Sequence, residues 1–210
     1  DKTGTLTAGR PAVAEKEYYG ENIEEALVLL ASVERESDHP LAKAVLAALG
    51  PAKFATVEET EVVKGAGIVA RVNGRRVAVG NRALMEREKV KLDEKVLADM
   101  ERFEKNGDSL VLTAVDGELK VLLGVRDQIR PGVKEDLRRL KKLGVKNLVM
   151  LSGDNQGTVD LVSRELGLTE AHGNMLPEDK AAYIKRLIEE ERQIVAFVGD
   201  GVNDSPSLAL

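Results

Sequence analysis

The first seven residues, Asp1-Lys2-Thr3-Gly4-Thr5-Leu6-Thr7, bring together a carboxylate, a cation, three hydroxyl groups and a glycine. These groups suit an attack on a phosphoryl group, because a carboxylate nucleophile can form an acyl phosphate. Asp, Thr and Gly also favour turns, so the same residues could form an ordinary polar turn. The specific order of the residues favours the chemical interpretation, provided that the rest of the chain supplies the partners that such an aspartate needs.

An acidic, glycine-rich loop near the end of the chain is a candidate metal site. In Gly199-Asp200-Gly201-Val202-Asn203-Asp204, the carboxylates of Asp200 and Asp204 are four residues apart. Magnesium ions usually bind one or two protein carboxylates together with water and phosphate oxygens. A divalent cation would also offset the repulsion between a carboxylate and a phosphoryl group. The structural alternative is a surface loop with capping residues.

A third loop and a lysine are candidates for binding the phosphoryl group. Anions bind at helix starts and at clusters of backbone amides, which Ser152-Gly153-Asp154-Asn155 can offer. Lys180 opens a predicted helix after Leu176-Pro177-Glu178-Asp179 and can supply a fixed positive charge. Alone, the serine-glycine loop is as often structural as functional. When three such polar loops meet at one edge of a sheet, a phosphate-binding role is favoured over a purely structural one.

The elements that must position these residues follow an α/β pattern from about residue 126 onward. Short apolar runs alternate with helical patterns, which is typical of a parallel sheet. The expected strands are 147–151 and 194–198, and the expected helices are 131–143, 158–166 and 178–190. Ligands bind at the carboxyl ends of parallel strands, where the two polar loops begin. Asp1 would need a similar strand before it.

The middle of the chain has a different pattern. Asn73-Gly74 and Asp116-Gly117 are strong two-residue hairpin signals, because both turn positions require a positive φ angle. The expected hairpins join 68–72 to 76–79 and 110–115 to 118–123. The expected helices are 23–34 after an Asn22 N-cap, 40–49, 81–88 and 93–106. Residues 8–11 are expected to connect the two parts, and the middle part to be an α+β module.

Composition excludes several classes of protein. The net charge of −5 over 210 residues leaves no basic surface for nucleic acid. The chain lacks cysteine, which excludes disulfides and thiolate metal sites, and its two histidines match no zinc spacing. The sequence contains no run of about 18 apolar residues that would span a membrane. With a catalytic signature at its first residue, it is expected to be a fragment of a larger protein.

Four motifs resemble, in the same order, those of the phosphorylation domain of P-type ATPases, whose fold is similar to the haloacid dehalogenase group. They are Asp1–Thr5, Ser152–Asn155, Leu176–Lys180 and Gly199–Asp204. Asp127-Gln128-Ile129-Arg130-Pro131 resembles the hinge of that family, through which the chain returns from the nucleotide domain. The resemblance covers nearly the whole chain.

The resemblance implies a role for each motif residue. Asp1 would be the phosphorylated nucleophile, and the phosphoryl group would be held by Ser152, Gly153 and Lys180. The Mg²⁺ ligands would be Asp1, Asp200 and the backbone carbonyl of Thr3. The residues that complete or support the site would be Lys2, Thr5, Asp154, Asn203 and Asp204. Ser152 stands where threonine is commoner, which keeps the hydroxyl group.

The middle part resembles the nucleotide domain of the heavy-metal transporting branch. Ser37-Asp38-His39-Pro40 resembles its Ser-Glu-His-Pro motif with Asp38 in place of Glu, and Gly65-Ala66-Gly67 and Val79-Gly80-Asn81 resemble two further motifs. The implied ATP-binding residues are Glu34, His39, Gly65, Gly67, Ile68, Gly80 and Asn81. Glycine suits such a site, because the missing Cβ lets a ligand approach the backbone.

Other interpretations of these residues are weaker. Gly65–Ala70 also fits a dinucleotide fingerprint, but a strand and an Asn-Gly turn follow it instead of a helix. The sequence contains no Walker-type phosphate loop. A single His-Pro at a helix start is more often structural, and His172 is expected in a loop.

We therefore expect an α/β, haloacid dehalogenase-like phosphorylation domain with a parallel sheet, formed by residues 1–8 and 126–210, with an inserted α+β nucleotide-binding domain, residues 9–125. The resemblance implies Mg²⁺-dependent transfer of the γ-phosphoryl group of ATP to Asp1 in the cytoplasmic part of an integral membrane pump. The partners would be ATP and the pump's own transmembrane and actuator domains, and no nucleic acid. The loops favour zinc, cadmium or cobalt as the transported ion, with copper and manganese left open.

Two alternatives have different expected behaviour. A soluble haloacid dehalogenase-type phosphatase usually has a second aspartate two residues after the nucleophile as acid and base, and here Thr3 occupies that position. A non-catalytic nucleotide-binding module would bind ATP without forming a phosphoenzyme. Without an actuator, the chain is expected to bind ATP with weak or no turnover.

Overall fold

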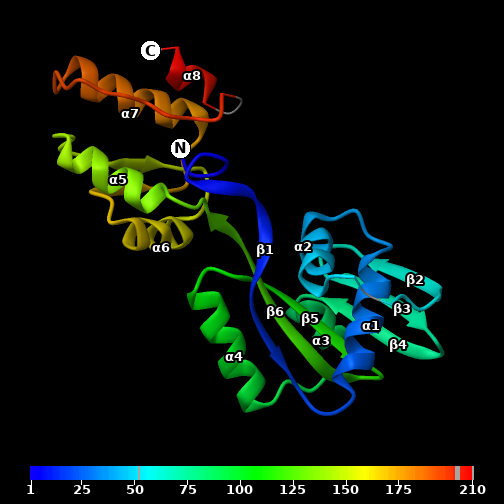
Figure 1. Cartoon of the computed structure of the whole chain (residues 1–210). Coiled ribbons are helices and arrows are strands. Elements are labelled where there is room, and N and C mark those ends of the chain that lie inside the picture. The colour runs from blue at the N-terminus through cyan, green and yellow to red at the C-terminus, as the bar shows by residue number, and fades with distance from the viewer. Residues whose placement is uncertain (52, 202–203, 210) are drawn as a thin grey trace. The chain divides into compact units, whose positions relative to one another are not determined.

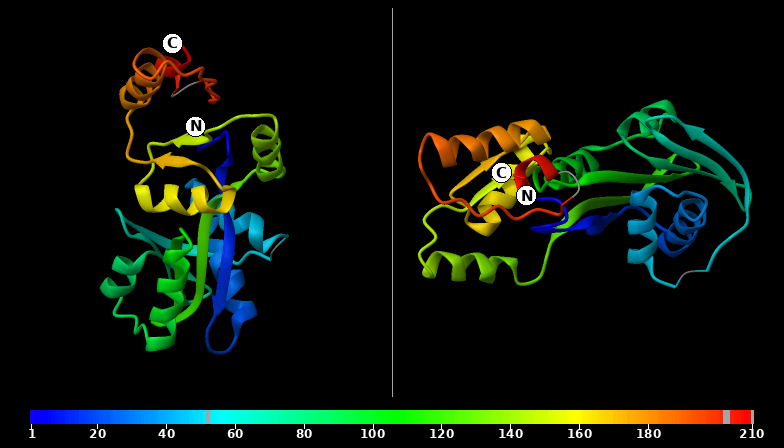
Figure 2. Two further views of the ribbon diagram at one scale, coloured as in Figure 1. Left: turned by 90° about the vertical axis from the view of Figure 1, so that its left-hand side faces the viewer. Right: turned by 90° about the horizontal axis from the view of Figure 1, so that it is seen from above.

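The computed structural model describes residues 1–51, 53–201 and 204–209 of the chain, which divides into two compact units (Figure 1). The first unit contains Asp1–Arg10 and Asp127–Leu210, and the second contains Pro11–Arg126. The first predicted boundary, after residue 8, lies two residues before the observed one. The second, after residue 125, lies one residue before the observed one. Both chain ends belong to the first unit (Figure 2).

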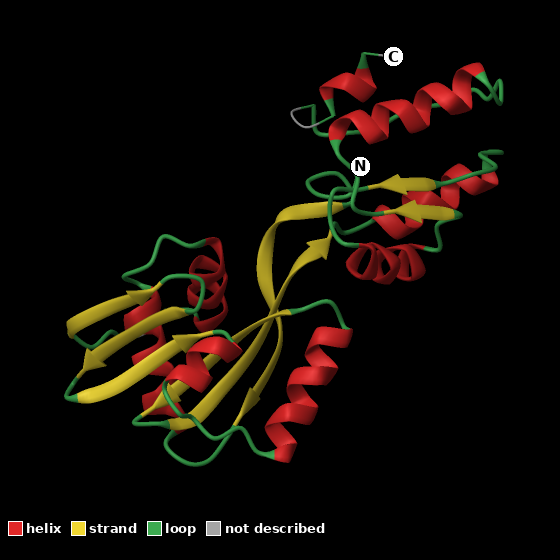
Figure 3. Ribbon diagram, turned by 180° about the vertical axis from the view of Figure 1, so that it is seen from behind, coloured by secondary structure: helices red, strands yellow, loops and turns green. Residues whose placement is uncertain are grey.

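The second unit is built on a six-stranded sheet with the strand order β1-β6-β5-β4-β3-β2. The strands are β1 (Thr7–Tyr18), β2 (Val57–Val63), β3 (Gly67–Val72), β4 (Arg75–Gly80), β5 (Ser109–Val115) and β6 (Glu118–Ile129). Neighbours from β2 to β6 pair antiparallel. β1 and β6 are long neighbouring strands (Figure 3), and the two points at which the chain passes from one unit to the other lie within them.

Both predicted hairpin turns are confirmed. The φ angles are 51° and 73° at Asn73 and Gly74, and 50° and 81° at Asp116 and Gly117. These left-handed conformations match the twist of a two-residue hairpin, which is why asparagine, aspartate and glycine occupy them. The turns set the register of β3 with β4 and of β5 with β6.

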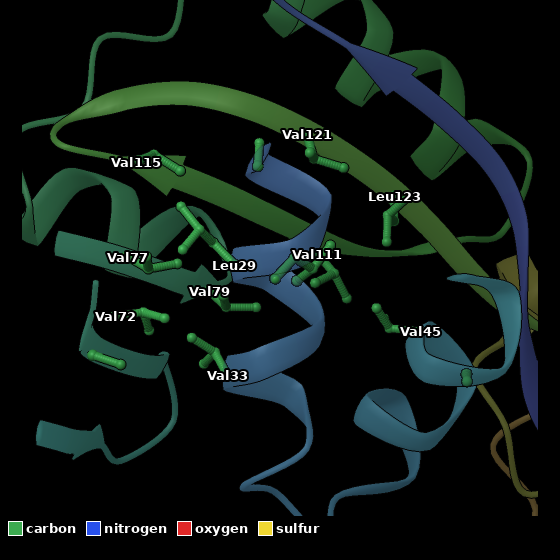
Figure 4. Packing of buried hydrophobic residues seen from close by; sticks show 14 of the residues in the cluster. Leu29, Val33, Val45, Val72, Val77, Val79, Val111, Val115, Val121 and Leu123 are labelled. Carbon is green, nitrogen blue, oxygen red and sulfur yellow. The ribbon is translucent and has the colours of Figure 1, made fainter. Parts of the chain in front are cut away.

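Helices cover both faces of this sheet. They are α1 (Ile23–Glu34), α2 (Pro40–Leu49), α3 (Arg82–Arg87) and α4 (Glu94–Lys105). On one face, Leu29 and Val33 of α1 pack against valines of the sheet such as Val72, Val79 and Val111 (Figure 4). On the other face, α3 and α4 form a second core that includes Leu84, Met100 and Phe103. Alternation of side chains along the strands supplies both cores.

The helix predictions for this unit hold, but three details were wrong. Residues 8–11 lie in β1 instead of forming a connection, and β2 was not predicted. β2 is an edge strand in which five of seven residues are exposed and three are glutamates, so its apolar signal is weak. Asn22 precedes α1 but has a left-handed backbone with a φ of 58°, and its side chain makes no capping hydrogen bond.

The described residues of the first unit form a short parallel pair of strands and four helices. The strands are β7 (Val149–Leu151) and β8 (Glu170–His172), and the helices are α5 (Val133–Lys142), α6 (Gln156–Leu166), α7 (Pro177–Glu189) and α8 (Ser205–Leu208). β8 places His172 in a strand and corrects the expected loop. Within the described residues, no helix is long and apolar enough to cross a lipid bilayer.

The predicted strand at 194–198 is wrong, because the structure gives these residues no regular secondary structure. Ile194 and Val198 are exposed, by 105% and 66%. The backbone nitrogen of Asp1 donates to the carbonyl oxygen of Val198 at 3.1 Å. A strand requires a partner's hydrogen bonds as well as apolar side chains, and the described residues give this segment no ladder.

Candidate active site

The carboxylate of Asp1 is held by two donors from different parts of the first unit. The Thr5 hydroxyl donates to Oδ2 at 3.0 Å, and the Lys180 ammonium donates to Oδ1 at 3.2 Å. The Asp1 side chain is 8% exposed, so both contacts lie in a partly dehydrated site where charge interactions are stronger than in water. The two donors fix the orientation of the carboxylate.

Lys180 is a buried cation between two carboxylates. Its ammonium also donates to Oδ1 of Asp204 at 2.9 Å, and Lys180 and Asp204 are 5% and 0% exposed. The motif at 176–180 forms the first turn of α7, where the Asp179 carboxylate accepts from the backbone nitrogen of Leu176 at 2.9 Å. This helix start directs Lys180 inward, and the cation offsets the charge of both aspartates.

Asp1, Asp200 and Asp204 form a cluster of carboxylates. One oxygen of each lies within 4.8 Å of those of the other two. Oδ2 of Asp204 is buried and has no hydrogen-bond partner within the described residues. A Cβ on Gly199 would lie 2.4 Å from that oxygen, so glycine is needed here. Oxygen donors of this kind fit Mg²⁺. The Asn203 prediction lies outside the described residues.

A clamp that the sequence did not reveal fixes the loop after Asp1. The backbone carbonyl of Lys2 accepts from Leu6 and Thr7 at 2.9 Å and 3.1 Å. Arg130 donates to the carbonyl oxygens of Gly4 and Thr7, and Asp127 accepts from the Thr7 hydroxyl and from Gly9. The predicted hinge motif contained the signal, since Asp127 and Arg130 are its two charged residues. They position the loop and do not touch Asp1.

The loop after β7 is joined to the first residues through a salt bridge between Lys2 and Asp154. Ser152 is buried, and its hydroxyl oxygen accepts from the Asp154 backbone nitrogen at 3.1 Å. Its carbonyl oxygen accepts from Met175, which links this loop to the start of α7. The bridge ties the Ser152 loop to the residue next to Asp1.

The structure therefore brings most of the predicted residues of the first unit together. Those joined by direct contacts or by the carboxylate cluster are Asp1, Lys2, Thr5, Asp154, Lys180, Asp200 and Asp204. Ser152 and Gly153 are attached through Asp154. Thr3 is exposed.

The predicted nucleotide residues of the second unit include one buried acid and one capping histidine. Burial raises the pKa of Glu34 to about 7, so its carboxyl group is half-protonated near neutrality. His39 is exposed, and its Nδ1 accepts from the backbone nitrogen of Leu41 at 3.1 Å at the start of α2. This capping contact leaves Nε2 of His39 available to a ligand.

The glycine motifs of the second unit pack closely against each other. Gly67 and Gly80 are register partners in β3 and β4, and a Cβ on Gly67 would lie 2.2 Å from the Val79 carbonyl oxygen. Asn81 caps α3 through Leu84 and donates to the carbonyl oxygen of Gly65 at 2.8 Å. A Cβ on Gly65, in contrast, would meet nothing within 4 Å. Gly65 is therefore the glycine with open space beside it.

Alanine at these two glycines should have different effects on stability. Gly67→Ala is expected to lower the free energy of unfolding by about 2–4 kcal/mol, because the methyl group overlaps backbone atoms. Gly65→Ala, at a φ of 75°, should lose only about 1–2 kcal/mol from backbone strain. Urea unfolding of both variants measures the difference. A loss at Gly65 equal to that at Gly67 would contradict the packing argument.

Comparisons with known proteins agree on one type of relative. The family model of haloacid dehalogenase-like hydrolases matches residues 1–210. A copper-exporting P-type ATPase of Staphylococcus aureus is 36% identical over 210 residues, which are 99% of this chain and 25% of that protein. The chain thus spans about a quarter of the length of the curated relatives that it matches.

Solved structures show the same similarity. A zinc-transporting PIB-type ATPase in the E2.Pi state matches with a TM-score of 0.82 and 33% identity, over 98% of this chain and 33% of that one. The catalytic domain of the CPx-ATPase CopB-B matches with a TM-score of 0.66 and 30% identity, over 100% of this chain and 74% of that one. The similarity extends over both units.

Proposed function

Because this chain belongs to the haloacid dehalogenase-like hydrolases, and within them to the heavy-metal transporting P-type ATPases, we propose that it transfers the γ-phosphoryl group of ATP to Asp1. The observation that carries the proposal is the buried Lys180 ammonium between Asp1 and Asp204. A lone surface aspartate is a poor nucleophile toward a phosphate anion. The contacts of Asp1 provide the positive charge and the fixed orientation that the reaction needs.

The proposed step needs no proton transfer. An oxygen of the Asp1 carboxylate forms a bond to the γ-phosphorus while the bond from that phosphorus to the bridging oxygen of ADP breaks, and ADP leaves with the electron pair. Lys180 and the Thr5 hydroxyl hold the carboxylate in place, and Lys180 also counters the charge that the transferred oxygens bring. The amides around Gly153 are proposed to receive those oxygens.

A magnesium ion fits the carboxylate cluster and would supply charge neutralisation at the phosphate oxygens when bound. The residues proposed to hold it are Asp1, Asp200 and the backbone carbonyl of Thr3. Asp204 belongs to the same cluster, and among the described residues its Oδ2 has no hydrogen-bond partner, which supports the fit. Asp204 keeps Lys180 in position through its other oxygen.

Release of the phosphoryl group is proposed to be slow in this chain alone. Hydrolysis by related phosphatases uses an acid two residues after the nucleophile, and Thr3 has no ionisable group there. We therefore propose ATP binding with weak or no turnover. In a complete pump, this part would lie on the cytoplasmic side of the membrane. Transmembrane and actuator domains of the same polypeptide would couple the aspartyl phosphate to transport of a heavy-metal cation.

Labelling with ATP that carries a radioactive γ-phosphate tests the proposal. In the presence of Mg²⁺, the wild-type chain should acquire an acid-stable label that hydroxylamine removes, because hydroxylamine cleaves acyl phosphates. A chain that binds ATP in this experiment and acquires no label would exclude phosphoryl transfer and favour a nucleotide-binding module.

His39→Gln should weaken ATP binding about tenfold, the loss expected when one ligand contact is removed. Glutamine keeps an acceptor for the Leu41 backbone nitrogen, so α2 should remain capped. His172→Gln is the matched control, since His172 is the only other histidine and lies in the first unit. Titration calorimetry with ATP measures both affinities. Equal affinities for the wild type and His39→Gln would contradict the proposed contact of His39 with ATP.

A further inference from the structure

Two acidic side chains of the second unit, Glu15 and Asp108, are not among the predicted nucleotide residues, and Asp108 is buried while Glu15 is partly buried. Glu15 belongs to β1, and Asp108 immediately precedes β5. Both oxygens of Asp108 and Oε2 of Glu15 are buried and lack a hydrogen-bond partner within the described residues. The Asp108 side chain is 0% exposed. Three buried acceptors without a donor are an unusual and unfavourable arrangement.

The two carboxyl groups approach each other across the strand that separates them. The strand order places β6 between β1 and β5, and Gly124 of β6 is the register partner of Leu110. A Cβ on Gly124 would lie 2.4 Å from Oδ2 of Asp108 and 3.0 Å from the Phe103 ring. Glycine therefore leaves the space that Asp108 occupies, and the two carboxyl groups lie within hydrogen-bonding reach of each other.

The neighbouring cations do not satisfy these acceptors. Arg126 of β6 is the nearest, with Nη1 3.7 Å from Oδ1 of Asp108, and it donates to the Asn106 carbonyl oxygen at 2.7 Å. Arg102 of α4 acts on Glu15 through its charge and forms its ion pair with Glu17. The Asn106 side chain donates to Oε1 of Glu15 at 2.9 Å, which leaves Oε2 of Glu15 without that donor.

We propose that Glu15 and Asp108 hold one proton between them, and that this shared proton fastens β1 to the β5 side of the sheet across Gly124. Ionised carboxylates only accept hydrogen bonds, so contact between two of them leaves charges facing each other without a hydrogen. One proton turns the contact into a short, charge-assisted O–H···O⁻ bond and satisfies an acceptor on each side. This pH-dependent hydrogen bond lies in the second unit and is independent of the proposed phosphoryl transfer.

The directions of the two pKa shifts agree with this geometry. Burial and the hydrogen bond to Glu15 raise the pKa of Asp108 to about 7, whereas the hydrogen bond to Asp108 lowers the pKa of Glu15. Asp108 is therefore the proton carrier, and Glu15 is the ionised partner.

The sign of the effect on stability follows from the two pKa values of Asp108. In the unfolded chain the carboxyl group loses its proton near its ordinary value of 3.8, and in the folded chain near 7. Between these values the folded state holds one proton more, so stability falls as pH rises through that window and levels off above about pH 7. The shared proton is therefore present in mild acid and is lost near neutrality.

Asp108→Asn tests the proposal, because the asparagine amide is a permanent donor of nearly the same shape. Between about pH 5 and about pH 7, the unfolding constant of the wild type should rise relative to that of the variant by close to tenfold per pH unit. The pKa of Glu34 is also raised to about 7, so its contribution is common to both proteins and cancels in the comparison. Equal pH dependence of the two proteins would overturn the proposal.

A second variant and a direct readout cover the other outcomes. If Asp108→Asn does not fold, Glu15→Gln supplies a donor from the opposite side and should weaken the same pH dependence, because only the part of the pKa rise that burial causes then remains. In carbon NMR spectra of aspartate-labelled protein, the Asp108 carboxyl signal should titrate near pH 7. Titration in the ordinary aspartate range would refute the shared proton. A saturable shift of that signal on adding Mg²⁺ or Zn²⁺ would show a cation site and would refute it as well.

Discussion

An Asp1→Asn variant should bind ATP normally and acquire no acid-stable label from ATP with a radioactive γ-phosphate. An amide has no carboxylate oxygen that can form an acyl phosphate, so labelling should fall below detection. The site should otherwise persist. Lys180 keeps its contact with Asp204, and the Thr5 hydroxyl can still donate to the amide oxygen. The measurement is scintillation counting of acid-precipitated protein together with calorimetry of ATP binding.

The matched control is Asp136→Asn, which changes the same chemical group at an exposed position in the first turn of α5. It should label as the wild type does. Equal labelling of Asp1→Asn and the wild type would mean that another residue receives the phosphoryl group, and the proposed function would be wrong. Loss of ATP binding in Asp1→Asn would show that the residue contributes to binding as well as to transfer.

Lys180→Met should produce the largest loss of stability among the single changes considered. Methionine retains the length of the side chain but leaves the fully buried Asp204 and the Asp1 carboxylate without their cation. Removing one partner from a buried ion pair lowers the free energy of unfolding by about 3–5 kcal/mol. Phosphoenzyme formation should be lost together with the positive charge. Urea unfolding and the labelling assay measure the two effects.

Lys185→Met is the matched control, because Lys185 is exposed on the same helix. It should change the free energy of unfolding by less than about 0.5 kcal/mol. Adding Asp204→Asn to Lys180→Met should recover part of the lost stability, since the uncompensated buried charge is then gone. A loss at Lys180 no greater than that at Lys185 would show that the buried ion pairs contribute little.

Sequence patterns predicted elements that are determined locally and failed for elements that depend on partners. The apolar spacing of α1 and the Pro40 start of α2 predicted those helices, and the dipeptides at 73–74 and 116–117 predicted the hairpins. The apolar run 194–198 resembles a strand as closely as β7 does, yet it has no ladder in the described residues. Apolar character indicates burial, but a strand also requires a neighbour.

The same distinction applies to the candidate site. Motifs with a fixed residue order identified Asp1, Lys180 and the loop at 199–204, because the chemistry constrains neighbouring positions. The hinge motif contained Arg130 and Asp127, but their contacts were not predicted, because they act on backbone groups whose positions only the fold defines. Glu15 and Asp108 had no sequence signal at all. Their contact depends on the strand order and on a glycine in the intervening strand.

The paired strands β1 and β6 have a consequence for engineering. The second unit begins at Pro11 and ends at Arg126, and these residues lie on neighbouring strands of one sheet. A domain whose two ends lie on neighbouring strands can be inserted into another protein, because it can replace the turn of a host hairpin without stretching the host backbone. Residues 11–126 should therefore tolerate transplantation into an unrelated scaffold as a single piece that keeps both of its cores.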